Sequence, residues 1–131
     1  MTLSEVCEML LCEVFVGKEQ FGTKIEYGCA ADLMSDVLAF SQPGALLLTG
    51  LVNTQTIQTA FIAEIKAIVF VRGKKPDSNV VALANEKKIP LLGSPYSMFE
   101  ACGILFRNGV VPTMSKRTRL EKCLTPKATD G

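Results

Sequence analysis

Three short apolar runs, each followed by a helical pattern, constrain the fold of this 131-residue chain more than any other feature. They are ALLLT at residues 45–49, AIVFV at 67–71 and PLLG at 90–93. Continuous apolar runs of this length are typical of parallel strands that are buried on both faces. The sequence therefore predicts an α/β fold with three layers, in which helices cover both faces of a mostly parallel sheet of four to five strands.

Polar residues that can cap a helix follow each apolar run. A capping side chain accepts a hydrogen bond from a free backbone N–H of the first helical turn, so its position predicts where the helix begins. The candidate caps are Asn53 after the first run, Asp77 or Ser78 after the second, and Ser97 with Glu100, or Ser94 with Pro95, after the third. The helix after the third run is predicted to end near Arg107.

The segment before residue 45 carries less regular signals. Thr2 and Glu5 have the form of a capping box, which predicts a short helix at the start of the chain. Asp32 stands at or near the expected N-cap of a later helix. The predicted elements are a helix around residues 3–10, a strand at 12–16, a strand at 24–27 and a helix at 31–40.

The length fits one domain with its own core. We expect a single domain at residues 1–112 and a basic, loosely ordered tail at residues 113–131. The five cysteines are odd in number and form no C-x-x-C pair, which argues against a disulfide framework or a thiolate zinc site. Neither a basic leader nor an apolar run of membrane length is present. A soluble protein of the reducing cytoplasm is therefore expected.

Charge is unevenly distributed, although the net charge is only +1. Residues 1–65 carry −6, residues 66–114 carry +4 and residues 115–131 carry +3. These segments either neutralise one another within one globule or form complementary surfaces across subunits. The segment KRTRLEK at residues 116–122 is basic, but the chain as a whole is nearly neutral and shows no groove-reading motif. Nucleic acid is therefore not an expected partner.

The basic turn RGKKP at residues 72–76 is a candidate anion site. In an open parallel sheet, ligands bind beyond the carboxyl ends of the strands, beside helix N-termini that favour anions. The turn lacks the G-x-x-x-x-G-K-[ST] pattern of a phosphate loop, and Asp77 would compete for the same N–H groups if it caps the next helix. The alternative is a permissive turn with solvated side chains. The residues predicted to bind an anionic metabolite or nucleotide are Thr49, Gly50, Asn53, Arg72, Gly73, Lys74 and Ser94.

No catalytic constellation is recognisable. The chain contains no histidine, which excludes Ser-His and Cys-His nucleophile activation and imidazole ligation of a metal. Asp32 and Asp36 lie four residues apart and would be able to hold magnesium, but capping by Asp32 beside a hydrated Asp36 is the favoured interpretation. Most of the cysteines are predicted to be buried structural thiols, including Cys7, Cys12 and Cys102. We therefore expect no enzyme activity, no cofactor and no metal.

Two of the predicted helices carry apolar residues on more than one side. Such side chains belong either to an internal core or to a subunit interface, most simply that of a two-fold homodimer. A homodimer is accordingly an expected assembly. The residues concerned are Leu33, Met34, Val37, Leu38 and Phe40 in the helix at 31–40, and Met98, Phe99, Cys102, Ile104, Leu105 and Phe106 in the last helix.

Three segments resemble the DRTGG domain: YGCAADLMSDVLAF, ALLLTGLVNTQTIQTAFIAEIKAIVFVRGKKP and IPLLGSPYSMFEACGILF. They fall within residues 25–107. The resemblance implies a stand-alone DRTGG domain, similar in fold to the N-terminal domain of HPr kinase/phosphorylase and to domains of phosphotransacetylases and CBS-containing pyrophosphatases. There the domain is an accessory, non-catalytic module tied to regulation or subunit contact. The letters D-R-T-G-G are absent here, because ALLLT is followed by Gly50, Leu51, Val52 and Asn53.

These features together predict a non-catalytic regulatory or ligand-sensing domain. It would bind an anionic metabolite or nucleotide at the carboxyl edge of the sheet and mediate dimerisation. Two alternatives remain open: a small phosphate-handling enzyme that uses Arg72, Lys74 and the Asp32/Asp36 pair, and a protein-interaction module without a ligand.

Overall fold

The structure, a computed structural model, describes residues 1–113 of the chain. Residues 114–131, which include all of the predicted tail except Thr113, lie outside the described residues. In chain order the elements are α1 (Leu3–Met9), β1 (Glu13–Val16), the 3-10 helix η1 (Lys18–Gln20), β2 (Tyr27–Ala30), α2 (Met34–Phe40), β3 (Leu46–Thr49), α3 (Thr54–Ile62), β4 (Ala67–Phe70), α4 (Ser78–Lys87), β5 (Leu91–Gly93), α5 (Met98–Arg107) and β6 (Val111–Pro112).

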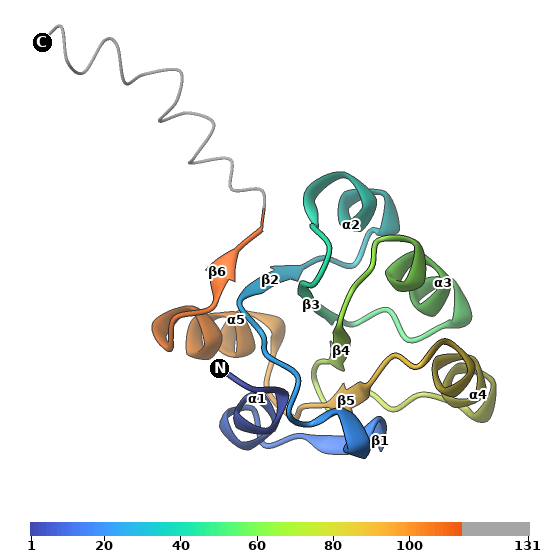
Figure 1. The fold of residues 1–131 in the computed structure, drawn as a ribbon, viewed down its shortest axis with the longest axis horizontal. Helices are drawn as coiled ribbons and strands as arrows, with labels where there is room; N and C mark the ends of the chain where they lie inside the picture. The colour runs from blue at the N-terminus through green and yellow to red at the C-terminus, as the bar shows by residue number, and fades with distance from the viewer. Residues whose placement is uncertain (114–131) are drawn as a thin grey trace, which may run out of the picture.

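The strands form one six-stranded sheet in the order β1-β5-β4-β3-β2-β6 (Figure 1). β2, β3, β4 and β5 are parallel neighbours, β6 is parallel to β2, and β1 runs antiparallel to β5. The three apolar runs therefore lie side by side and point in one direction, which confirms the prediction. The sheet has six strands instead of the expected four or five, because the two-residue β6 adds an edge that is too short to recognise in the sequence.

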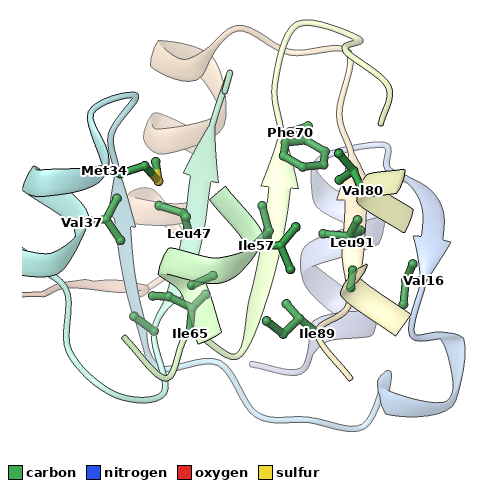
Figure 2. Close-up of a cluster of buried hydrophobic side chains, with 14 residues drawn as sticks. Val16, Met34, Val37, Leu47, Ile57, Ile65, Phe70, Val80, Ile89 and Leu91 are labelled. Carbon is green, nitrogen blue, oxygen red and sulfur yellow. The ribbon is translucent and has the colours of Figure 1, made fainter. Parts of the chain in front are cut away.

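Helices cover both faces of the sheet, which gives the predicted three layers (Figure 1). α2, α3 and α4 lie on one face, and α1 and α5 lie on the other. Because successive side chains of a strand point to opposite faces, Leu47 of β3 reaches the first face while Leu46 and Leu48 reach the second. The core of the first face includes Val16, Met34, Val37, Leu47, Ile57, Ile65, Phe70, Val80, Ile89 and Leu91 (Figure 2).

Most of the predicted helix starts are confirmed. The capping boxes of Thr2 with Glu5 and of Ser97 with Glu100 are both formed, and the second selects Ser97 over Ser94 as the start of α5. Asn53 caps α3, and Asp77 caps α4 by accepting a hydrogen bond of 3.0 Å from the Val80 N–H. Within residues 1–113, none of the helices combines the length and the apolar character needed to cross a bilayer.

The predicted strand at residues 24–27 is wrong by three residues, because β2 begins at Tyr27. The residues just before it pair with the start of the chain instead of joining the sheet. Thr2 forms an antiparallel bridge with Lys24, and the Ile25 N–H donates to the carbonyl of Met1 over 2.7 Å. A long-range contact with the N-terminus, which has no local sequence signal, therefore determines where β2 begins.

Candidate functional site

The carboxyl ends of β2, β3, β4 and β5 form one edge of the sheet, which we call the rim. Thr49 of β3 lies beside Phe70 of β4, which in turn lies beside Gly93 of β5. The residues that follow these strands are therefore brought together, as the parallel order requires. The rim, as defined here, comprises Asp32, Thr49, Gly50, Arg72, Gly73, Lys74 and Ser94.

Asp32 binds the end of β3 and does not cap α2. Its Oδ1 accepts hydrogen bonds from the Gly50 N–H at 2.7 Å and from the Thr49 hydroxyl at 3.1 Å. The N-cap of α2 is Leu33, which makes no side-chain capping bond, so the prediction that Asp32 is the cap is wrong. The cause is the pairing of β2 with β3, which places Asp32 within reach of a buried hydroxyl and a buried backbone N–H.

Two basic side chains converge over Gly50. Lys74 donates from Nζ to the Gly50 carbonyl at 2.8 Å. Arg72 extends over the same residue, and its Nη2 lies 2.9 Å from the point where a Cβ on Gly50 would stand. A side chain at position 50 would therefore displace the guanidinium from this place.

The turn that carries Arg72 is fixed by backbone hydrogen bonds. Arg72 adopts a left-handed conformation with φ of 59°. Its N–H donates to the Tyr96 carbonyl at 2.7 Å, and the Gly73 N–H donates to the Ser94 carbonyl at 2.8 Å. Because a left-handed backbone is costly for a side chain other than glycine, these bonds hold a conformation that a free turn would seldom adopt. The backbone position from which the Arg72 side chain extends is thus built into the fold.

The rim carries an unmatched positive charge. Neither of the ion pairs found within residues 1–113 involves Arg72, Lys74 or Asp32. Around Gly50 there are two cations and one carboxylate, which leaves one positive charge in excess. An excess cation beside oriented strand ends attracts an anion.

Asn53 and Ser94 serve the fold in this arrangement. The Asn53 Oδ1 accepts from the Thr56 N–H at 2.9 Å and so caps α3. The Ser94 hydroxyl is buried, donates to the Leu10 carbonyl at 2.6 Å and accepts from the Tyr96 N–H at 3.2 Å. Their predicted role as ligand contacts remains a prediction, while the structure shows them as supports of the rim.

A small hollow of about 140 Å³ opens beside Lys74, between the strand end of β5 and the start of β1. Gly73, Lys74 and Ser94 line it together with Glu13 and Lys75. Lys75 pairs with Glu13 at 3.4 Å, and both side chains are more than half exposed, so this pair contributes little to stability.

Asp32 and Asp36, which the sequence analysis weighed as a magnesium pair, have different roles in the structure. Asp32 is engaged by β3, whereas Asp36 lies in the first turn of α2. Within residues 1–113 there is no group of three or more histidine, cysteine, aspartate or glutamate side chains that would hold a metal ion.

Comparison with known proteins assigns the family. The model of the DRTGG domain matches residues 5–107, which is most of the chain. The chain belongs to the DRTGG domain family. A search among curated proteins found no match for this DRTGG domain.

The fold of this DRTGG domain is also that of a solved structure. The crystal structure of the CBS and DRTGG domains of the regulatory region of Clostridium perfringens pyrophosphatase, complexed with its activator diadenosine tetraphosphate, matches with a TM-score of 0.69 and 16% sequence identity. The match covers 88% of this chain and 50% of that one, so the DRTGG domain described here spans about half of its structural neighbour.

The DRTGG domain also has an apolar groove that the sequence did not predict. Its volume is about 360 Å³, and it lies between α5 and the strands β2 and β3. The sequence does not predict the groove because its lining residues lie far apart in the chain. Most of them are small or apolar, and none of them alone indicates a binding site. The lining includes Cys29, Leu48, Phe99, Cys102, Phe106 and Pro112.

The thiols of the described cysteines are poor nucleophiles. Cys7, Cys12, Cys29 and Cys102 are free and half-buried. Burial raises the pKa of Cys12 to about 12, and burial together with the nearby Cys102 thiol raises the pKa of Cys29 to about 11. Because the thiolate is the reactive form, neither thiol is activated at neutral pH. This agrees with the prediction of structural thiols, although the four are half-buried instead of fully enclosed.

Proposed function

We propose that this DRTGG domain is a non-catalytic regulatory module that binds an anionic metabolite or a nucleotide at the rim. The observation that carries the proposal is the convergence of Arg72 and Lys74 over Gly50, with one positive charge in excess. A guanidinium offers several N–H donors in a planar fork that suits phosphate oxygens, and the lysine adds a second cation. The ligand phosphate binds Arg72 first, because Lys74 already donates to the Gly50 carbonyl.

A nucleotide fits this rim better than free phosphate does. Both hydrogen bonds of Asp32 within the described residues use Oδ1, and the residue is exposed, so Oδ2 remains available to a hydroxyl donor. A ligand with a phosphate for Arg72 and a sugar hydroxyl for Asp32 satisfies both charges at once. The structural neighbour supports this class of ligand, since it is a regulatory region in complex with a dinucleotide activator.

Two features support a non-catalytic role. The sequence has no histidine to serve as a general base, and burial raises the pKa values of the four described thiols. The groups of the rim are suited to binding an anion, since the side chains of Arg72 and Lys74 offer N–H donors and no acceptor. The rim binds an anion without cleaving it.

The domain also associates with a second copy of itself. Phe99 is 89% exposed and Phe106 is 65% exposed, and both lie beside the apolar groove. Leu33 and Leu38 of α2 are exposed as well. The sequence left open whether these side chains belong to an internal core or to an interface, and their exposure in the single chain favours the interface. Apolar side chains of this size are stabilised when a partner removes them from water.

A thermal-shift screen tests the ligand proposal. Inorganic phosphate, adenosine triphosphate and diadenosine tetraphosphate are each added to the protein. A ligand at about 100 times its dissociation constant stabilises the fold by about 2.7 kcal/mol. We expect stabilisation by at least one nucleotide, and we expect Arg72→Ala combined with Lys74→Ala to abolish it.

The matched control for that screen is Lys18→Ala. Lys18 is exposed and lies in η1, after the end of β1. Because β1 runs antiparallel to β5, this residue stands at the edge opposite the rim. Loss of stabilisation in the control as well as in the double variant would mean that overall charge, and not the rim, attracts the ligand. Turnover of any of the three probes would contradict the non-catalytic role.

A further inference from the structure

We propose that two copies of this chain associate through α5, with the two helices antiparallel and crossing at Gly103. This inference rests on the proposed dimerisation and assigns it to one surface. We call this surface the α5 flank, defined by Phe99, Glu100, Gly103, Phe106 and Arg107. Three independent features of the flank favour a second copy as its occupant.

The first feature is a glycine in the middle of α5. Glycine is among the least favourable residues in a helix interior, so it needs a reason to be there. Gly103 has no positive φ, and a Cβ at this position would meet nothing within 4 Å. Neither the backbone conformation nor the packing of the described residues therefore requires glycine. Close approach of a second helix would require glycine at this position, because the absence of a side chain allows the two backbones to come together.

The second feature is the pair of phenylalanines on either side of this glycine. Phe99, Gly103 and Phe106 have the spacing that places residues on one face of a helix. The two rings are the most exposed aromatic side chains among residues 1–113. Both also line the apolar groove of about 360 Å³. In an antiparallel crossing centred on Gly103, Phe99 of each copy lies near Phe106 of the other copy.

The third feature is charge complementarity. Glu100 and Arg107 have the same seven-residue spacing as the phenylalanines, lie beside them on the helix and are exposed. An antiparallel pair centred on Gly103 brings Glu100 of each copy opposite Arg107 of the other. The flank is thus complementary to itself, which is the property that a two-fold interface requires. A parallel pair would place like charges together.

Exposed apolar side chains elsewhere lack these features. Ile62 at the end of α3 is 70% exposed but belongs to the opposite face of the sheet and does not line the groove beside α5. It therefore provides a matched control for the loss of an exposed apolar group.

Sedimentation velocity over a range of protein concentrations tests the proposal. The wild-type protein is expected to dimerise, and Gly103→Leu is expected to raise the dissociation constant about tenfold or more, since it separates the two helices at their crossing. Ile62→Glu is expected to leave the constant within about twofold, a change of under half a kcal/mol. Circular dichroism confirms that each variant remains folded.

Charge exchange between copies gives the sharper test. Arg107→Glu alone and Glu100→Arg alone each place like charges across the crossing, so each variant is expected to be monomeric. An equimolar mixture of the two restores both opposite-charge pairs in a heterodimer and is expected to recover dimerisation. A structural defect in either variant would not be rescued by mixing.

The outcomes separate this inference from the proposed function. The assignment to α5 would be overturned if Gly103→Leu did not weaken the wild-type dimer. It would also be overturned if mixing the two single-charge variants did not restore dimerisation. Neither result would contradict dimerisation itself. A wild-type protein that stays monomeric at the highest concentration measured would overturn both. The ligand screen on the same variants is independent, because the rim lies at a strand edge and not on the α5 flank.

Discussion

The rim and the α5 flank both reach solvent, but they differ in how completely their groups are satisfied. At the rim, Asp32, Thr49 and Ser94 each make hydrogen bonds within the chain, and a cation remains in excess. On the α5 flank, Phe99 and Phe106 are exposed to water beside an open groove. The rim is thus the site that we propose for a small charged ligand, whereas we propose that another chain completes the flank.

The largest effect is expected for a residue beneath the rim. Phe70 ends β4, is fully buried and packs on the face of the sheet that α2, α3 and α4 cover, beside Val80 (Figure 2). Phe70→Ala removes that side chain and leaves a cavity, so urea unfolding should show a loss of about 3–5 kcal/mol. A loss below about 1 kcal/mol would mean that the structure under the rim is loosely packed, and the rim would then not be preformed.

The second effect concerns Asp32. Asp32→Ala leaves the buried Thr49 hydroxyl and the buried Gly50 N–H without their acceptor, which should cost about 1–3 kcal/mol in urea unfolding. Asp36→Ala is the matched control, because Asp36 makes no side-chain hydrogen bond or ion pair within the described residues, and it should cost less than about 1 kcal/mol. Equal losses in the two variants would contradict the role of Asp32 at β3.

A smaller effect is expected at the start of α4. Asp77→Ala removes the cap that accepts from the Val80 N–H and should destabilise the protein by about 1 kcal/mol in the same assay. Asp77→Asn retains a capping oxygen and should stay within a few tenths of a kcal/mol of the wild type. If the asparagine variant loses as much as the alanine variant, the charge of Asp77 and not its hydrogen bond stabilises α4.

The smallest effect is expected on the α5 flank. Phe106→Ala should change the unfolding free energy of the monomer by less than about 0.5 kcal/mol, because the ring is 65% exposed. The measurement is made at a protein concentration at which the chain is monomeric, since association would add its own stabilisation. A loss of more than 1 kcal/mol, large for a surface side chain, would show that Phe106 is packed within its own chain, and the contrast with the rim would fail.

Most of the fold was predictable because its signals are local. The apolar runs of β3, β4 and β5 are bounded by glycine or small polar residues, and the caps Asn53 and Asp77 lie next to the helices that they start. β2 and α2 were placed less well, because long-range partners determine where they begin: Ile25 bonds to Met1, and Asp32 bonds to Gly50. β6 has two residues, which is too short for any pattern.

The part of the rim that follows from the order of the parallel strands could be predicted from the sequence. Thr49, Gly50, Arg72 and Lys74 meet because parallel strands end at one edge. Asp32 was missed as a partner of Gly50, although the pairing of β2 with β3 would have indicated it: the residues after neighbouring parallel strands lie side by side. The groove beside α5 depends on side chains from four separate segments, and no single segment predicts it.

Binding of an anionic nucleotide at the rim is tested most directly by nuclear magnetic resonance. Adenosine triphosphate is titrated into the ¹⁵N-labelled protein, and the amide shifts are mapped onto the structure. The account predicts that the largest shifts fall on Gly50, Arg72, Gly73 and Lys74, and that they disappear when Arg72 and Lys74 are both replaced by alanine. An absence of shifts, or shifts centred on α5 or on the opposite edge of the sheet, would contradict it.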